Sequence, residues 1–137
     1  MKKDMKKELD NLRIEPYGIC FTKNIRGSQI NCSITSIDSS EINGSFECTD
    51  KELESLINTT KNVFKNMPEL DKKAKELIKI NYPDEDNNLP LDDIIFYDNH
   101  EFSLGYDAGE SVAGPLYIYV KFNKDFTRKK ELIYEIY

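Results

Sequence analysis

The sequence predicts a single α+β domain over residues 1–137, with an antiparallel sheet of about five or six strands and two helices packed on one face. Three observations predict this fold class. Apolar and polar residues alternate in the first and last thirds of the chain, as they do in half-buried strands. In the middle third, apolar residues recur at three- and four-residue steps, as they do in amphipathic helices. No linker or internal repeat divides the chain, so the expected order is β-β-(β)-α-α-β-β-β.

The first third is expected to form a β-meander. Residues 1–12 are rich in lysine and fit either a short helix or a frayed end. Alternation then predicts strands at 17–25 and 29–37, joined by a turn that contains Gly27. A third and weaker strand is expected at 41–48.

The middle third is expected to form two helices. Thr49 and Glu52 have the spacing of a capping box, in which each side chain meets the other residue's free backbone N–H. Pro68 cannot continue the same helix but suits the first turn of a new one, so the two helices should meet there. The apolar stripe of the first helix comprises Leu53, Leu56, Ile57, Thr60, Phe64 and Met67, and that of the second comprises Leu70, Ala74, Leu77 and Ile78.

The last third is expected to be β-rich again. Residues 82–91 read as a proline-bounded acidic loop, and residues 91–97 fit either one helical turn or a strand. Residues 102–122 have the pattern of a hairpin, with a Gly-, Ala- and Pro-rich loop around 107–115 that is longer than the tight two-residue kind. Alternation at 132–136 predicts a last strand.

The acidity of the chain is concentrated in one window. The net charge is −6, yet the residues between Ile80 and Val120 include nine acids and no lysine or arginine, so the remainder of the chain is net basic. Like charges held together destabilise a compact state by self-repulsion, which makes the window a candidate interaction surface as well as a solubilising one. The nine acids are Asp84, Glu85, Asp86, Asp92, Asp93, Asp98, Glu101, Asp107 and Glu110.

Several functional classes find no support in the sequence. Three cysteines argue against a disulfide framework, and no apolar run has the length of a signal peptide or a membrane span, so we expect a cytoplasmic protein. There is no glycine-rich phosphate-binding motif, and a chain with a pI near 4.9 is a poor partner for nucleic acid. We expect no cofactor.

Catalytic and metal-binding motifs are also weak. Asp84, Asp86 and Asn88 open like a calcium loop, but Leu89 and Ile95 occupy positions that need Gly and Glu, so no metal site is predicted. His100, the one histidine, is expected to be an exposed residue at a strand end rather than a catalytic base. We assign no catalytic residue.

The aromatic residues of the last third favour protein binding. Tyr117 and Tyr119 lie opposite the Leu-Ile-Val face of their strand, so both rings should face outward if the helices cover the apolar face. Tyrosine offers a large, stiff contact area with a polar tip. The candidate partner-binding residues are Asp84, Glu85, Asp86, Asp107, Glu110, Tyr117 and Tyr119.

The runs at 102–110 and 116–122 resemble small uncharacterised bacterial proteins, some of which are immunity proteins encoded beside toxins. The resemblance covers the last third of the chain and implies a cytoplasmic protein that binds and blocks one cognate toxin, often a basic nuclease. Our first hypothesis is therefore a non-enzymatic inhibitor of a basic protein, present as a monomer or weak homodimer. The alternatives are a small hydrolase that uses the carboxylates of Asp107 and Glu110, or a structural subunit of a homo-oligomer.

Overall fold

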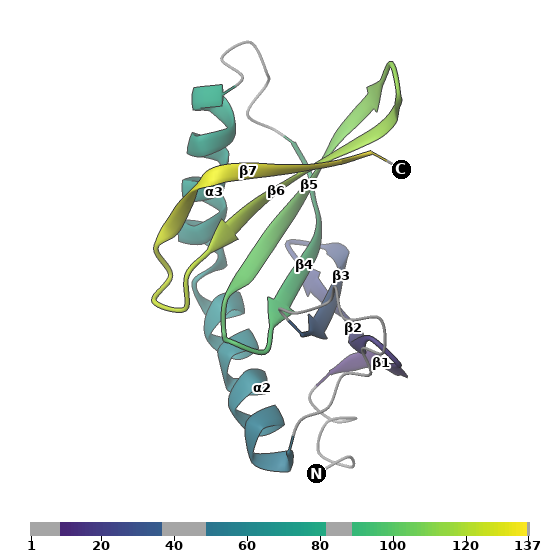
Figure 1. The fold of residues 1–137 in the computed structure, drawn as a ribbon, viewed down its shortest axis with the longest axis vertical. Coiled ribbons are helices and arrows are strands. Elements are labelled where there is room, and N and C mark those ends of the chain that lie inside the picture. The colour runs from purple at the N-terminus through teal and green to yellow at the C-terminus, as the bar shows by residue number, and fades with distance from the viewer. Residues whose placement is uncertain (1–8, 37–48, 82–88, 137) are drawn as a thin grey trace.

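The computed structural model describes residues 9–36, 49–81 and 89–136, which form seven strands and two helices of an α+β fold (Figure 1). The elements in chain order are β1 Asp10–Glu15, β2 Gly18–Ile25, β3 Ser28–Thr35, α2 Asp50–Lys65, α3 Met67–Asn81, β4 Leu91–Tyr97, β5 Phe102–Ser111, β6 Gly114–Phe122 and β7 Arg128–Ile136.

The sheet has seven strands, whereas the sequence predicted five or six. Spatial order follows chain order from β1 to β7, and every neighbouring pair is antiparallel except β3 and β4, which run parallel. Two strands are additional within the described residues: β4, and β1, which lies partly within the segment predicted to be a short helix or a frayed end. The ambiguous segment 91–97 is strand β4. The weak strand predicted at 41–48 lies outside the described residues.

The parallel pairing of β3 with β4 follows from the arrangement of the helices. In Figure 1, α2 and α3 follow one another end to end along the sheet. Two helices in line act as one crossover and return the chain to the end of the sheet from which β3 started. The sequence predicted an antiparallel sheet, and this one pair of strands departs from that prediction.

The helix signals in the sequence are confirmed. The Oγ1 of Thr49 accepts a hydrogen bond from the Glu52 N–H, and the Glu52 carboxylate accepts one from the Thr49 N–H, both at 3.1 Å. The first helix ends at Lys65, and Pro68 is the second residue of α3, where its missing N–H costs no hydrogen bond.

The hairpin of β5 and β6 is confirmed, but its predicted long loop is wrong. Ser111 pairs with Gly114, so the turn consists of two residues. Two glycines that indicated a loop have other roles. Gly109 has a φ of 81° at an irregularity between Asp107 and Glu110, and Gly114 has a φ of 128° directly after the turn. Glycine adopts these angles without steric cost, which lets the strands continue past the bulge.

A row of phenylalanine rings crosses the core. Phe96 of β4 stacks on Phe21 of β2 at 6.4 Å, and Phe102 stacks on Phe122 at 5.0 Å between ring centroids. Phe64 of α2 meets the rings of Phe21 and Phe96 edge-on at 6.4 and 5.9 Å. These contacts fix the first helix against the middle of the sheet, because edge-to-face pairs add specific geometry to apolar burial.

A buried hydrogen bond attaches the second helix to the sheet. The hydroxyl of Tyr106, whose residue is fully buried, donates to Asp71 Oδ1 of α3 at 2.6 Å. Burial and the neighbouring Asp71 carboxylate raise the pKa of Tyr106, so it remains a donor at any physiological pH. Lys75 approaches the other oxygen, Asp71 Oδ2, at 3.2 Å.

We predict that Tyr106→Phe lowers the free energy of unfolding by about 1–3 kcal/mol, because it leaves the buried carboxylate of Asp71 short of a donor. Urea unfolding at neutral pH measures this change. The matched control is Tyr17→Phe, which removes a hydroxyl from a ring that is 54% exposed. Equal losses in the two variants would contradict a special contribution from the bond between Tyr106 and Asp71.

Candidate functional site

Strand β4 places an acidic residue on the sheet face opposite the phenylalanine row. Ile94 and Phe96 are buried in the core, so the alternation of the strand turns Asp93, Ile95 and Tyr97 to the other face. The strand register then sets out one row across the sheet, in which neighbouring residues pair in the order Asn31, Asp93, Gly105, Tyr119 and Ile133.

The Asp93 carboxylate lies over the backbone of the neighbouring strand. A Cβ atom at Gly105 would overlap Asp93 Oδ1 and would lie 2.6 Å from Cε1 of Tyr119. Only glycine at this position leaves room for both side chains. The Tyr119 hydroxyl donates to Asp93 Oδ2 at 3.0 Å, whereas Asp93 Oδ1 is buried and has no hydrogen-bond partner.

This environment disfavours the charged form of Asp93. Burial raises its pKa to about 6, and the nearby Asp92 and Glu135 charges act in the same direction, while the hydrogen bond from Tyr119 opposes them. A carboxylate with a raised pKa is a group whose charge the fold does not compensate.

More carboxylates gather around Asp93. The pairing of β4 with β5 is irregular between Leu91 and Asp93, and the intervening Asp92 lies close enough to Asp107 for the two charges to interact. Burial, followed by the Asp107 charge, raises the pKa of Asp92. In the adjacent row, Tyr117 pairs with Asp107 on one side and with Glu135 on the other. We call this set the acid–tyrosine surface: Asp92, Asp93, Asp107, Glu135, Tyr117 and Tyr119.

Tyr117 reports the negative potential of the acid–tyrosine surface. The Asp92 charge is the largest cause of its raised pKa, and Asp107, Asp93 and Glu110 add to it. Among the residues that the structure describes, no lysine or arginine forms an ion pair with Asp92, Asp93 or Asp107.

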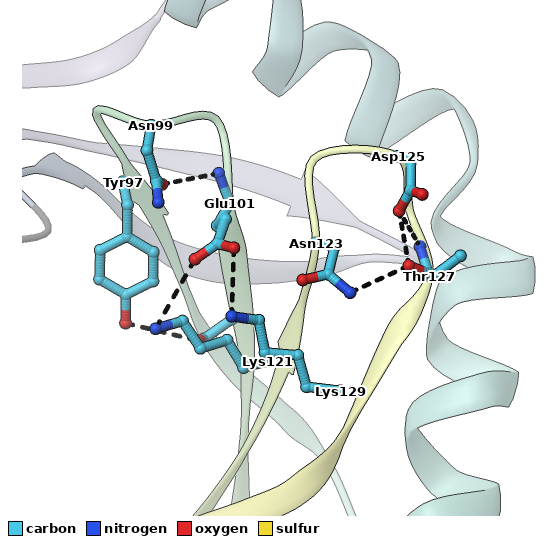
Figure 2. A network of polar contacts seen from close by, with 9 residues as sticks. Tyr97, Asn99, Glu101, Lys121, Asn123, Asp125, Thr127 and Lys129 are labelled. Atoms are coloured by element: carbon cyan, nitrogen blue, oxygen red, sulfur yellow. Dashed lines mark hydrogen bonds and ion pairs between the residues drawn. The ribbon is translucent and has the colours of Figure 1, made fainter.

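The other end of the same face shows what a compensated carboxylate looks like (Figure 2). Glu101 receives Lys121 at 3.8 Å and Lys129 at 3.1 Å, and Lys121 also lies over the Tyr97 ring at 5.0 Å. Burial alone would raise the pKa of Glu101, but hydrogen bonds from Asn99 and Lys129, together with the two ammonium charges, lower it. The pKa of Asp93, at one end of this face, is therefore raised, whereas the pKa of Glu101, at the other end, is lowered.

The sequence-predicted site residues are only partly brought together. Asp107 is half-buried and accepts a hydrogen bond from the Gly109 N–H at 2.8 Å, and Glu110 is exposed beyond the bulge. Tyr117 is half-buried between Asp107 and Glu135. Tyr119 lies on the face that was predicted, opposite Ile118 and Val120, but it is only 5% exposed, so its ring is buried rather than open to a partner. Asp84, Glu85 and Asp86 lie outside the described residues.

Sequence reasoning missed three members of the surface: Asp92, Asp93 and Glu135. The signal for Asp93 was present, since it alternates with Ile94 and Phe96 once 91–97 is taken as a strand. Its long-range counterpart Gly105 lies in a neighbouring strand, and no local pattern links the two. The position of Asp92 depends on an irregularity that the sequence does not mark.

His100 and Cys32, a possible base and a possible nucleophile, have structural roles. Nδ1 of His100 lies 2.7 Å from the Thr59 hydroxyl of α2, and the residue is half-buried, which corrects the expectation of an exposed histidine. Burial raises the pKa of the Cys32 thiol to about 12, so it does not supply a thiolate. Within the described ranges, no three His, Cys, Asp or Glu side chains form a group that could hold a metal ion, and no helix is long and apolar enough to cross a membrane.

Comparison with protein-family models, with curated proteins and with solved structures gave no match to this chain.

The raised pKa of Asp93 makes protein stability depend on pH in a defined direction. An aspartate in an unfolded chain has a pKa of about 3.9, and Asp93 in the folded protein has a pKa of about 6. Between these values the folded state holds a proton that the unfolded state has released. The contribution of Asp93 to the free energy of unfolding is therefore greatest below about pH 4 and is lost as the pH rises to about 6.

We predict that Asp93→Asn removes this loss. The difference in free energy of unfolding between variant and wild type should shift in favour of the variant as the pH rises from about 4 to about 6. Urea unfolding at several pH values across this window measures it. Glu54→Gln, which removes one charge from an exposed position on α2, serves as the control for the loss of a single charge. A flat difference for Asp93→Asn would contradict the pKa assignment.

Proposed function

We propose that this chain is a non-enzymatic, cytoplasmic binding protein of the immunity type, which neutralises a basic cognate toxin by covering part of it with the acid–tyrosine surface. One observation carries the proposal. Asp92, Asp93 and Asp107 cluster on one face of the sheet, and no ion pair from the described residues compensates them.

The clustered carboxylates of Asp92, Asp93 and Asp107 are unfavourable in their charged forms. Each of Asp92 and Asp93 has a raised pKa, caused first by burial and then by neighbouring acids. A cation about 4 Å from a carboxylate is worth roughly 1 kcal/mol in water and several times more near a protein surface. A basic partner that places lysine or arginine side chains here therefore gains attraction and also relieves the repulsion already present in the free protein.

The Glu101 cluster supports this argument from within the same molecule. There, two lysines approach one carboxylate on the same sheet face, and its pKa is lowered rather than raised. The partner would supply to Asp92 and Asp107 what Lys121 and Lys129 supply to Glu101, and its positive charge would also act on the more deeply placed Asp93. Arginine suits the role best, because its guanidinium can bind a carboxylate through two parallel hydrogen bonds.

The fold supports the proposal by its division of the sheet into two faces. We infer that α2 and α3 both cover the face that carries the phenylalanine row, since Phe64 contacts Phe21 and Phe96, and Asp71 contacts Tyr106. Neither of the two described helices then covers the opposite face, which we assign to the partner. On it, Tyr117 supplies the aromatic contact, and the buried Tyr119 holds Asp93 in place from the side.

No observation favours the alternative that the chain is a hydrolase using Asp107 and Glu110. An acid–base pair needs one carboxyl group held in its neutral form by desolvation. Glu110 is exposed, and the Asp107 carboxylate accepts the Gly109 N–H in a local turn, so neither side chain is in that setting. Asp93 is the acid with the strongly raised pKa, but its Oδ1 is buried over the backbone of Gly105 rather than turned toward a substrate cavity.

We predict that a double variant, Asp92→Asn with Asp107→Asn, captures the partner less well than wild type. Tagged wild type and double variant are exposed to lysate of the source cells at low salt, and the retained basic protein is identified. Its association rate with each is then measured at two salt concentrations. The double variant should associate several-fold more slowly at low salt, and the two rates should converge at high salt, because screening removes electrostatic steering.

A charge-matched control separates this surface from net charge. Glu54→Gln with Glu69→Gln also removes two acids, but from exposed positions on α2 and α3. We expect it to associate nearly as fast as wild type. Equal association rates for all three proteins at low salt would exclude the acid–tyrosine surface from the interface.

A further inference from the structure

A second site lies in a cavity of about 210 Å³ between the β2–β3 turn, the first turns of α3 and the start of β4, where Leu91 precedes Asp92 of the acid–tyrosine surface. Its lining is mostly apolar, with a few polar groups on one side. Arg26, Ser28, Asp71 and Lys75 are the polar lining residues, and the apolar ones are Ile25, Ile30, Met67, Leu89, Pro90 and Leu91.

The carboxylate in the cavity wall is already fully engaged. The side chain of Asp71 is only 11% exposed; its Oδ1 accepts from Tyr106 at 2.6 Å, and its Oδ2 receives Lys75 at 3.2 Å. Arg26 approaches the same Oδ2 at 3.6 Å, which is too long for a hydrogen bond. Two cations thus converge on one anion, and the cavity carries a formal excess of one positive charge.

The guanidinium of Arg26 is the group best placed to use that excess. Its side chain is 62% exposed, and among the described residues it makes only the long contact to Asp71, so its fork of N–H donors is available to a ligand. A carboxylate matches this fork, because the two can form a pair of parallel hydrogen bonds. A phosphate dianion matches it less well, since the Asp71 carboxylate lies beside the guanidinium and repels a second negative charge.

The backbone at Arg26 is unfavourable for arginine. Arg26 and Gly27 form the two-residue turn between the paired residues Ile25 and Ser28, with φ values of 52° and 87°. Such a turn favours Asn, Asp or Gly at its first central position, because other side chains are strained in the left-handed region. Arg26 occupies this position and lines the cavity.

We propose that this cavity binds a small monocarboxylate with a short apolar body, with the carboxylate on Arg26 and the hydrocarbon against Ile30, Met67 and Leu91. The cavity is smaller than the 300–1,000 Å³ typical of drug-sized ligands, which limits the apolar body to a few carbons. This inference is independent of the proposed function, since it uses different side chains and a different charge.

Hexanoate is the probe. Titration of the full chain with hexanoate, followed by NMR of the Met67 and Ile30 methyl groups, should give saturable shifts. 1-Hexanol, hexylamine and inorganic phosphate should each bind at least roughly tenfold more weakly, because each lacks the charge or the apolar body. Equal binding of any of the three, or no saturable shift with hexanoate, would overturn the proposal.

A substitution at Arg26 separates binding from folding. Arg26→Asn should weaken hexanoate binding at least roughly tenfold, yet leave the midpoint of thermal unfolding unchanged or higher, because asparagine suits the left-handed turn. Arg13→Asn, which removes an exposed arginine from β1, is the matched control and should bind hexanoate as wild type does. Undiminished binding by Arg26→Asn would overturn the assignment. The Asp92 and Asp107 double variant should bind hexanoate at least as well as wild type, because it keeps Arg26 and removes two negative charges near Leu91, so the two proposals fail separately.

Discussion

The two-residue period of strand β4 is the constraint on which both the core and the candidate surface depend. Ile94 and Phe96 must point into the core, where Phe96 joins the row of stacked rings. The same alternation forces Asp93 to the opposite face, over Gly105 and beside Tyr119. A slip of one residue would bury a carboxylate among phenylalanines, so the apolar half of the strand holds the acidic half in place. The packing of the core thus keeps the acids close together although they repel one another.

The two ends of one sheet face provide an internal comparison of carboxylate environments. Glu101 has two lysines, and its pKa is lowered, whereas Asp93 has two acidic neighbours and an oxygen without a hydrogen-bond partner, and its pKa is raised. Burial alone acts in the same direction on both. Asp93 is the more deeply buried of the two and lacks the hydrogen bonds and ammonium charges that lower the pKa of Glu101. A basic partner would change the neighbouring charge, and a neutral one would not.

Local patterns predicted the local structure well. The capping box at Thr49, the break at Pro68 and the hairpin of β5 and β6 each depend on residues close in sequence, and each is confirmed. The predictions that failed concern features that depend on residues distant in the sequence. The parallel pairing of β3 with β4 follows from two helices lying in line, and the burial of Tyr119 follows from a row of residues drawn from five strands. The acidic window was visible in the composition, but Asp92 and Asp93 could be singled out only once the register was known.

The most direct test of this account is the pKa of the Asp93 carboxyl group itself, measured by following its ¹³C resonance in an NMR titration of the folded protein. The account predicts a midpoint of about 6, well above the value near 4 of an ordinary aspartate. It also predicts that a bound basic partner lowers this midpoint, because a nearby cation favours the charged form. A midpoint near 4 in the free protein would show that the fold already compensates this charge, and the central argument for a basic partner would be lost.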